Sequence, residues 1–230
     1  MCYSFKTSVV SYSLGMLSAI FCFCTRQIVL GTLILCYCQM QLSEMIIWHG
    51  IDNNNDNTNK LGTSIGKYLL ATHNIAIGIG IILYVIFILK RKMKLTDFIP
   101  VLVGLAFFIF VVVYYYLPNN YPSITRQLKP CDSTSKCQNS KNRLVWPFPH
   151  GWYFFSFIIS LLILLFYIKP LSTKIWLASV FTVTFLFTLF LMKANVVGSV
   201  WCFSTAILAP VIGIVGYFLI REKNKKDVMT

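Results

Sequence analysis

The chain has 230 residues, of which 57% are hydrophobic and only 12% are charged. A soluble domain of this length could not bury so much apolar surface, and disordered or fibrous chains have other compositions. The composition therefore predicts a multi-pass membrane protein. A net charge of +13 would suggest nucleic-acid binding in a soluble protein. Here the bases lie in short clusters beside apolar runs, as topology signals do, so we expect no nucleic-acid partner.

Seven apolar runs are long enough to cross a bilayer, which takes about 20 mostly apolar residues. They are Thr7–Thr25, Ile28–His49, Thr63–Leu89, Leu95–Leu117, Gly151–Ile168, Ser172–Met192 and Asn195–Ile220. Backbone groups must be satisfied inside the hydrocarbon, so we expect one all-α bundle of about seven helices over residues 1–220, with the lipid bilayer as its partner. The first run could instead be the apolar part of a signal peptide that follows Lys6.

Three polar segments lie between or after these runs. The tract Gly50–Gly62 is rich in Asp and Asn, which predicts a solvated loop. The segment Pro118–Pro149 predicts a polar outer loop, and Arg221–Thr230 predicts a charged cytoplasmic tail. Aromatic residues near the ends of the runs are typical of a belt at the membrane interface: Trp48, Tyr114–Tyr116, Trp146, Trp152 and Trp201.

The distribution of bases predicts the orientation in the membrane. Seven spans place nine Lys and Arg residues on the N-terminal side and eleven on the other, and five of the nine lie in Pro118–Pro149. That loop also holds Cys131 and Cys137, a pair that predicts a disulfide in an oxidising compartment. Without the loop the count is four against eleven. We therefore expect an extracellular or lumenal N-terminus and a cytoplasmic C-terminus.

The remaining cysteines give weaker signals. Cys22, Cys24, Cys36 and Cys38 form two Cys-x-Cys pairs, and residues two apart point to different faces of a helix. We expect them to be buried as small apolar side chains. The pairing of Cys2 and Cys202 stays open.

Polar residues inside the runs gather in the outer half of the expected bundle. Glu44 is the strongest signal, because a charged residue in a membrane usually faces the interior or a cavity. It shares a helix face with Gln41 and Trp48, at spacings i, i+3 and i+7. One interpretation is a structural pair with Lys67. The other is an outward-facing polar pocket that binds a small cation, a proton or a lipid; its ligand-binding candidates are Glu44, Lys67, His73 and Trp201.

The three histidines are candidates for metal ligands and for catalytic bases. His49, His73 and His150 with a carboxylate could bind zinc. The chain has no His-x-x-x-His and no His-Glu-x-x-His, and it lacks the paired helical histidines of membrane hydrolases of the alkaline-ceramidase type. The sequence therefore predicts no metal site and no cofactor. A membrane-embedded lipid hydrolase with Glu44, His73 or His150 as catalytic residue remains an alternative.

A family resemblance covers several short motifs. The opening Met1-Cys2-Tyr3-Ser4, the segment Gln39–Trp48, His73 and the segment Gly198–Cys202 resemble a family of small multi-pass membrane proteins that begin Met-Cys-Trp-Ser. This family occurs in bacteria, protists and large DNA viruses and has no established activity. The chain departs from it at Tyr3, where tryptophan is usual. The resemblance implies positions of interest without assigning a reaction: Cys2, Ser4, Glu44, His73, Trp201 and Cys202.

Three functions therefore remain open: binding or transport of a small cation or proton, a structural or assembly role, and lipid hydrolysis. The first two are favoured over an enzyme.

Overall fold

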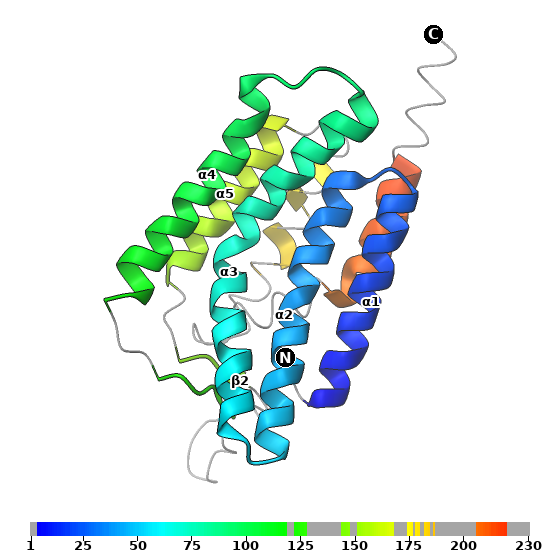
Figure 1. Ribbon diagram of the computed structural model, residues 1–230. Helices are drawn as coiled ribbons and strands as arrows, with labels where there is room; N and C mark the ends of the chain where they lie inside the picture. The colour runs from blue at the N-terminus through cyan, green and yellow to red at the C-terminus, as the bar shows by residue number, and fades with distance from the viewer. Residues whose placement is uncertain are drawn as a thin grey trace.

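The computed structural model describes residues 4–118, 122–127, 144–147, 151–167, parts of 174–186, and 206–219. Its long elements are α1 (Phe5–Cys24), α2 (Ile28–Asp52), α3 (Asp56–Tyr84), α4 (Ile99–Phe110) and α5 (Gly151–Tyr167). A π-helical segment, Val85–Leu89, extends α3, and another, Val111–Tyr116, extends α4. The helices lie side by side with their axes roughly aligned (Figure 1).

Within the part of the chain that the structure describes, four helices are long and apolar enough to cross a membrane. They are Phe5–Cys24, Ile28–Asp52, Asp56–Leu89 and Leu95–Tyr116. Shorter apolar helices follow at Ile158–Tyr167 and Ala206–Leu219. The chain is therefore a helical multi-pass membrane protein, and many of its large apolar side chains are exposed on the outside of the bundle, as a lipid-facing surface requires.

A tight hairpin joins α1 to α2. The Ser4 side chain caps α1 by accepting the Thr7 backbone N–H at 3.2 Å. The turn after α1 is closed by Arg26 in the left-handed conformation, with φ 63°. The Gln27 side chain in this turn is buried, and its Nε2 donates to the carbonyl of Gly213 at 2.9 Å. The turn is thus fixed to the last described helix.

The connection between α2 and α3 is shorter than the sequence predicts. Only Asn53–Asn55 separates the two helices, so the expected solvated loop over Gly50–Gly62 is wrong. Asn54 adopts a left-handed conformation with φ 52°, and the Asn55 side chain caps α3 by accepting the Thr58 N–H at 3.1 Å. Asn and Asp favour turns and helix caps, so a polar composition here marks helix ends that project into water rather than an open loop.

Glycines bring α3 close to its neighbours. A Cβ on Gly78 would lie 2.5 Å from the backbone N of Val101, and a Cβ on Gly104 would lie 2.6 Å from the backbone N of Ile75. The backbones of α3 and α4 therefore cross at a distance that only glycine permits, as in other tightly packed membrane helices.

Part of the segment Pro118–Pro149 folds back onto the bundle. Strands β1 (Arg126–Gln127) and β2 (Leu144–Val145) pair antiparallel with Arg126 opposite Val145. Beside them, Thr125 and Trp146 are buried. This pair lies at the end of the bundle where α2 turns into α3, which we name the α2–α3 end (Figure 1). The opposite end, with the α1–α2 turn and the α3–α4 connection, is named the α3–α4 end.

The predicted aromatic belt is wrong for its tryptophans in the described residues. Trp48, Trp146 and Trp152 are each at most 3% exposed. Trp146 fits against Gly66, where the missing side chain leaves room for the indole. Trp152 packs against Phe107 with ring centroids 6.1 Å apart. These rings fill the space between helices because their large apolar faces gain more from packing there than at a headgroup surface.

The helix Ala206–Leu219 runs beside α1 and in the same direction (Figure 1). Its start faces Gly15, where an added Cβ would lie 3.8 Å from the Cβ of Ala206. Further along, a Cβ on Gly213 would lie 3.2 Å from the sulfur of Cys22. The contact of Gly15 with Ala206 is followed, seven residues later on each helix, by that of Cys22 with Gly213, so the two helices are parallel.

Candidate functional site

A stripe of small residues forms the buried face of α1. It includes Ser8, Ser11, Gly15, Ser18, Ala19 and Cys22. Spacings of three and four residues place them on one side of the helix. Small side chains allow α2 and Ala206–Leu219 to approach closely, which is how membrane helices associate.

Four buried polar side chains lie on neighbouring turns of α1 and α2: Ser8, Ser11, Gln41 and Glu44. Each is fully buried. We name them the Ser–Gln–Glu cluster. The Ser11 hydroxyl donates to Gln41 Oε1 at 2.7 Å. Gln41 and Glu44 are one helical turn apart on the buried face of α2.

The pairing register of the two helices places Ser8 level with Glu44. Gly15 of α1 faces Cys38 of α2. Ser11 lies four residues before Gly15 on α1, and it contacts Gln41, which lies three residues after Cys38 on α2. One more step in this antiparallel register brings Ser8 opposite Glu44. Glu44 lies eight residues from the end of α2 at Asp52, a rise of roughly 12 Å. The cluster is thus well inside the span.

Two atoms of this cluster are buried without a hydrogen-bond partner in the described part of the chain. They are Gln41 Nε2 and Ser8 Oγ. A buried polar group without a partner costs about 1–3 kcal/mol, so native proteins hold few of them. A half-turn of the Gln41 amide would exchange its nitrogen and oxygen and present the oxygen instead. The cluster can therefore offer either a donor or an acceptor to an additional group.

Elsewhere in the described bundle, two sets of buried hydrogen bonds join its elements. The Asn74 amide donates to Ser156 Oγ at 3.0 Å and accepts from Ser160, which joins α3 to α5. Asn59 Nδ2 donates to the Thr125 carbonyl at 2.9 Å, and Thr63 Oγ1 lies 2.8 Å from Thr125 Oγ1. Such bonds tie transmembrane helices and loops together. They serve the structure, and the Ser–Gln–Glu cluster differs from them in its unused atoms.

His73 is buried at the middle of α3, and its ring packs on Tyr37 with centroids 4.3 Å apart. Tyr37 and Glu44 are seven residues apart on α2, a rise of about 10.5 Å. His73 and Glu44 are therefore both inside the protein, and the ring contact places His73 about two turns from Glu44 along α2.

Lys67 lies among aromatic rings near the start of α3. Its Nζ is 4.5 Å from the centroid of the Tyr116 ring and 5.9 Å from that of Tyr68. The Tyr116 hydroxyl donates to the Lys67 carbonyl at 2.9 Å. A cation over the face of an aromatic ring is attracted by the ring quadrupole, so this lysine fastens α3 to the end of α4.

The histidines within the described residues do not form a metal site. His49 is exposed at the end of α2, where its Nδ1 lies 3.2 Å from Asn53 Nδ2. Tyr37, which contacts His73, is twelve residues away on the same helix, a rise of roughly 18 Å. No group of three His, Cys, Asp or Glu residues that could hold a metal occurs in the described part of the chain.

Several predicted site residues lie outside the described residues: Cys2, Cys131, Cys137, His150, Trp201 and Cys202. Of the cysteines in the first two spans, Cys22 and Cys38 are buried as predicted, Cys36 is only partly buried, and Cys24 is exposed, which contradicts the prediction. All four described cysteines carry free thiols.

The sequence prediction omitted Ser8 and Ser11. The signal was present, because Ser4, Ser8, Ser11, Gly15 and Ser18 repeat at alternating spacings of four and three. Serine is only weakly polar, so this stripe is a much weaker signal than a charged residue such as Glu44 within an apolar run.

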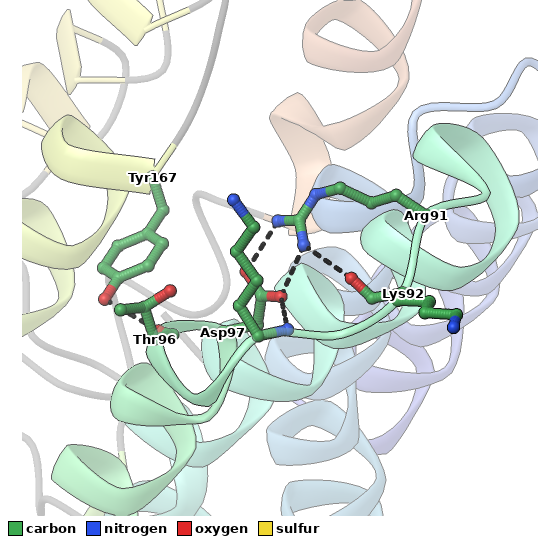
Figure 2. A network of polar contacts seen from close by, with 6 residues as sticks. Arg91, Lys92, Thr96, Asp97 and Tyr167 are labelled. Atoms are coloured by element: carbon green, nitrogen blue, oxygen red, sulfur yellow. Dashed lines mark hydrogen bonds and ion pairs between the residues drawn. The ribbon is translucent and has the colours of Figure 1, made fainter.

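The α3–α4 end carries a second polar arrangement (Figure 2). Arg91 reaches across the connection to Asp97, with Nη1 to Oδ2 at 2.8 Å and Nη2 to Oδ1 at 2.7 Å. Asp97 also accepts the backbone N–H of Lys94 at 2.7 Å. These hydrogen bonds raise the pKa of Arg91, which keeps the guanidinium charged.

Comparisons with known proteins do not assign this chain to a group. No family model, no curated protein and no solved structure matches it.

Proposed function

We propose that this membrane protein binds a proton or a small cation at the Ser–Gln–Glu cluster, as a channel or transporter does. One observation carries the proposal: the fully buried carboxylate of Glu44 lies one turn from Gln41, whose end that has no partner among the described residues presents its oxygen after a half-turn of the amide. Hard cations prefer oxygen ligands, and carboxylate, amide and hydroxyl groups supply them. An ionisable residue inside a membrane is costly, and such residues commonly mark ion pathways.

The proposed bundle has seven spans. Trp152 contacts Tyr116 at the end of the α4 helix, and Tyr167 bonds the Thr96 carbonyl near its start, so α5 is antiparallel to α4. The direction of α5 is therefore that of α1 and α3, and Ala206–Leu219 also runs parallel to α1. Because α5 and Ala206–Leu219 cross the membrane in the same direction, the chain must cross once in the opposite direction between these two helices. The helical residues 174–176, 178–179 and 182–184 support a sixth span there.

The charges at the two ends support the proposed orientation. Among the described residues, the α3–α4 end exposes five bases in its turns, Arg26, Lys90, Arg91, Lys92 and Lys94, beside one buried acid, Asp97. Within the same described ranges, the α2–α3 end exposes three bases, Lys6, Lys60 and Arg126, and two acids, Asp52 and Asp56. Excess Lys and Arg stay in the cytoplasm. We therefore place the α3–α4 end in the cytoplasm and the N-terminus outside.

Cysteine labelling checks this orientation. In a background without native cysteines, Asp56→Cys should react with an impermeant maleimide in intact cells, and Lys92→Cys should react only after the membrane is opened. The reverse pattern would show that the orientation is wrong.

A disulfide between Cys131 and Cys137 remains part of the proposal. Five intervening residues can close a tight loop if the Cα atoms come within about 7 Å. Peptide mass spectrometry of oxidised, alkylated protein should find the two peptides linked; alkylation of both thiols in that material would disprove the bond. Membership of the family that begins Met-Cys-Trp-Ser is likewise a proposal, supported by the burial of Glu44 and His73.

Ion movement in liposomes tests the function. The full chain, reconstituted in vesicles with a trapped dye that reports pH, sodium or potassium, should equilibrate an imposed gradient of that ion faster than empty vesicles. Glu44→Gln should abolish that movement and still fold, because glutamine keeps the shape and hydrogen-bonding capacity of the side chain.

Asp52→Asn is the matched control, since it removes an exposed carboxylate from the same helix. Its rate should equal that of the unchanged protein. A folded Glu44→Gln protein that moves ions at the unchanged rate, or an unchanged protein no faster than empty vesicles, would refute the proposal.

A further inference from the structure

The α3–α4 connection is a short loop whose backbone is fixed from several sides. Lys90 ends the π-helical turn in the left-handed conformation, with φ 47°. Asp97 holds the loop from within through two bonds from Arg91 and one from the Lys94 N–H. On the outside, the Tyr167 hydroxyl donates to the Thr96 carbonyl at 3.1 Å, which ties the loop to the end of α5 (Figure 2).

Arg91 forms an ion pair with Asp97, and three further bases lie in the same loop. The carboxylate of Asp97 also interacts electrostatically with Lys94, so one acid stands against four bases, Lys90, Arg91, Lys92 and Lys94. All three lysines are exposed. Among the described residues of the connection from Lys90 to Asp97, no other acid is present to balance them.

Exposed apolar side chains flank the lysines on both sides. Leu89 is 45% exposed, Leu95 is 83% exposed and Phe98 is 40% exposed. In water such exposure would be unfavourable, but beside a bilayer these side chains enter the hydrocarbon. Lysines attached next to them then extend to the depth of the lipid headgroups, because their long apolar stems let the ammonium reach the polar layer.

We propose that the Lys90–Lys94 loop is a built binding site for the phosphate of anionic phospholipids. The Arg91–Asp97 clamp holds the backbone, and Lys90, Lys92 and Lys94 supply the positive charge that the phosphate meets. Leu89 and Leu95 set the loop at headgroup depth. This site lies at the α3–α4 end, and it does not depend on the Ser–Gln–Glu cluster or on ion movement.

Lipid titration of the purified full chain tests the site. Native mass spectrometry should show tighter binding of phosphatidylglycerol than of phosphatidylcholine with the same acyl chains. A base near an anionic surface is worth about 1 kcal/mol, or roughly fivefold in affinity. Each single change Lys90→Gln, Lys92→Gln or Lys94→Gln should therefore weaken phosphatidylglycerol binding about fivefold, and the triple change about 100-fold.

The matched control removes three exposed bases from the α2–α3 end by Lys6→Gln, Lys60→Gln and Arg126→Gln. It should bind phosphatidylglycerol like the unchanged protein. An equal loss in this control would overturn the site. So would binding of inorganic phosphate as tight as that of the lipid, because the loop would then be a free-phosphate site.

Asp97→Asn separates a built site from general charge attraction. The change raises the net charge by one, so attraction alone predicts tighter lipid binding. A clamp that positions the lysines predicts weaker binding, because Arg91 and the Lys94 N–H lose their carboxylate partner. Weaker binding by folded Asp97→Asn protein is the expected result, and tighter binding would overturn the proposal.

Discussion

The indole of Trp146 packs directly against Gly66 of α3, and this contact tests whether Trp146 attaches the segment Pro118–Pro149 to the bundle. An alanine in place of Gly66 would put its Cβ 2.7 Å from Cζ3 of the indole and 2.6 Å from Ser43 Oγ. Ordinary carbon contacts are about 3.5–4.0 Å, so the ring would have to move by roughly 1 Å. Trp146 is only 2% exposed, so any movement of the ring disturbs its packed neighbours. Gly66→Ala should therefore cost about 1–3 kcal/mol of stability, the usual range for overpacking.

Removing the ring first should reduce this effect. Trp146→Ala alone should cost about 3–5 kcal/mol, since it deletes a buried indole. In that background, Gly66→Ala no longer meets the indole and meets only Ser43 Oγ, so it should cost less than in the unchanged protein. The coupling between the two positions should then exceed about 0.5 kcal/mol, as measured for residues in contact.

Thermal unfolding in detergent measures all four proteins of this cycle. For a chain of this size, each kcal/mol corresponds to a shift of about 2–4 °C. The tryptophan emission of Gly66→Ala should also shift to the red as Trp146 leaves its seat. Additive effects of the two changes, with no coupling beyond about 0.5 kcal/mol, would show that the indole does not occupy the space above Gly66.

Three further changes probe other contacts, each by the same thermal unfolding measurement. Asn74→Ala should cost about 1–3 kcal/mol, because two hydroxyls of α5 lose their partner in the bundle interior; an unchanged midpoint would contradict this bond. Gly78→Ala should cost a similar amount by meeting the α4 backbone, whereas Gly213→Ala meets only side-chain atoms at 3.2 Å or more and should cost much less. Equal unfolding midpoints for Gly78→Ala and Gly213→Ala would contradict this prediction. Asn55→Ala should cost about 1 kcal/mol by removing the cap of α3, and Asn55→Asp should restore it.

Hydrophobic runs predicted the first four helices to within a few residues at most of their ends. The exception was the start of α3, which the sequence placed at Thr63 and the structure places at Asp56. The cause is the double use of Asn and Asp, which both cap helices and populate loops. The sequence predicted seven spans, whereas four helices within the described residues are long and apolar enough to cross a membrane.

Of the Ser–Gln–Glu cluster, the sequence predicted Glu44 as a site residue but not the two serines. Glu44 stands out because a carboxylate in an apolar run demands an explanation. Its neighbours Ser8 and Ser11 belong to another helix, and the register that brings Ser11 to Gln41 depends on packing at Gly15. Tryptophan placement failed for a similar reason, since the sequence near Trp146 does not show the gap that Gly66 opens in α3.

The neighbouring position of α1 and Ala206–Leu219 has a consequence for the order in which the protein assembles. The first helix leaves the ribosome long before the last one is made, since roughly 180 residues separate Cys24 from Ala206. At about 5–20 residues per second, that interval is on the order of 10–40 seconds. During this time the face of α1 that carries Gly15 and Cys22 lacks the helix that later covers it. Chains stopped before Ala206 should therefore expose this face to the insertion machinery or to other subunits, and completion of the last helix acts as the closing step of folding.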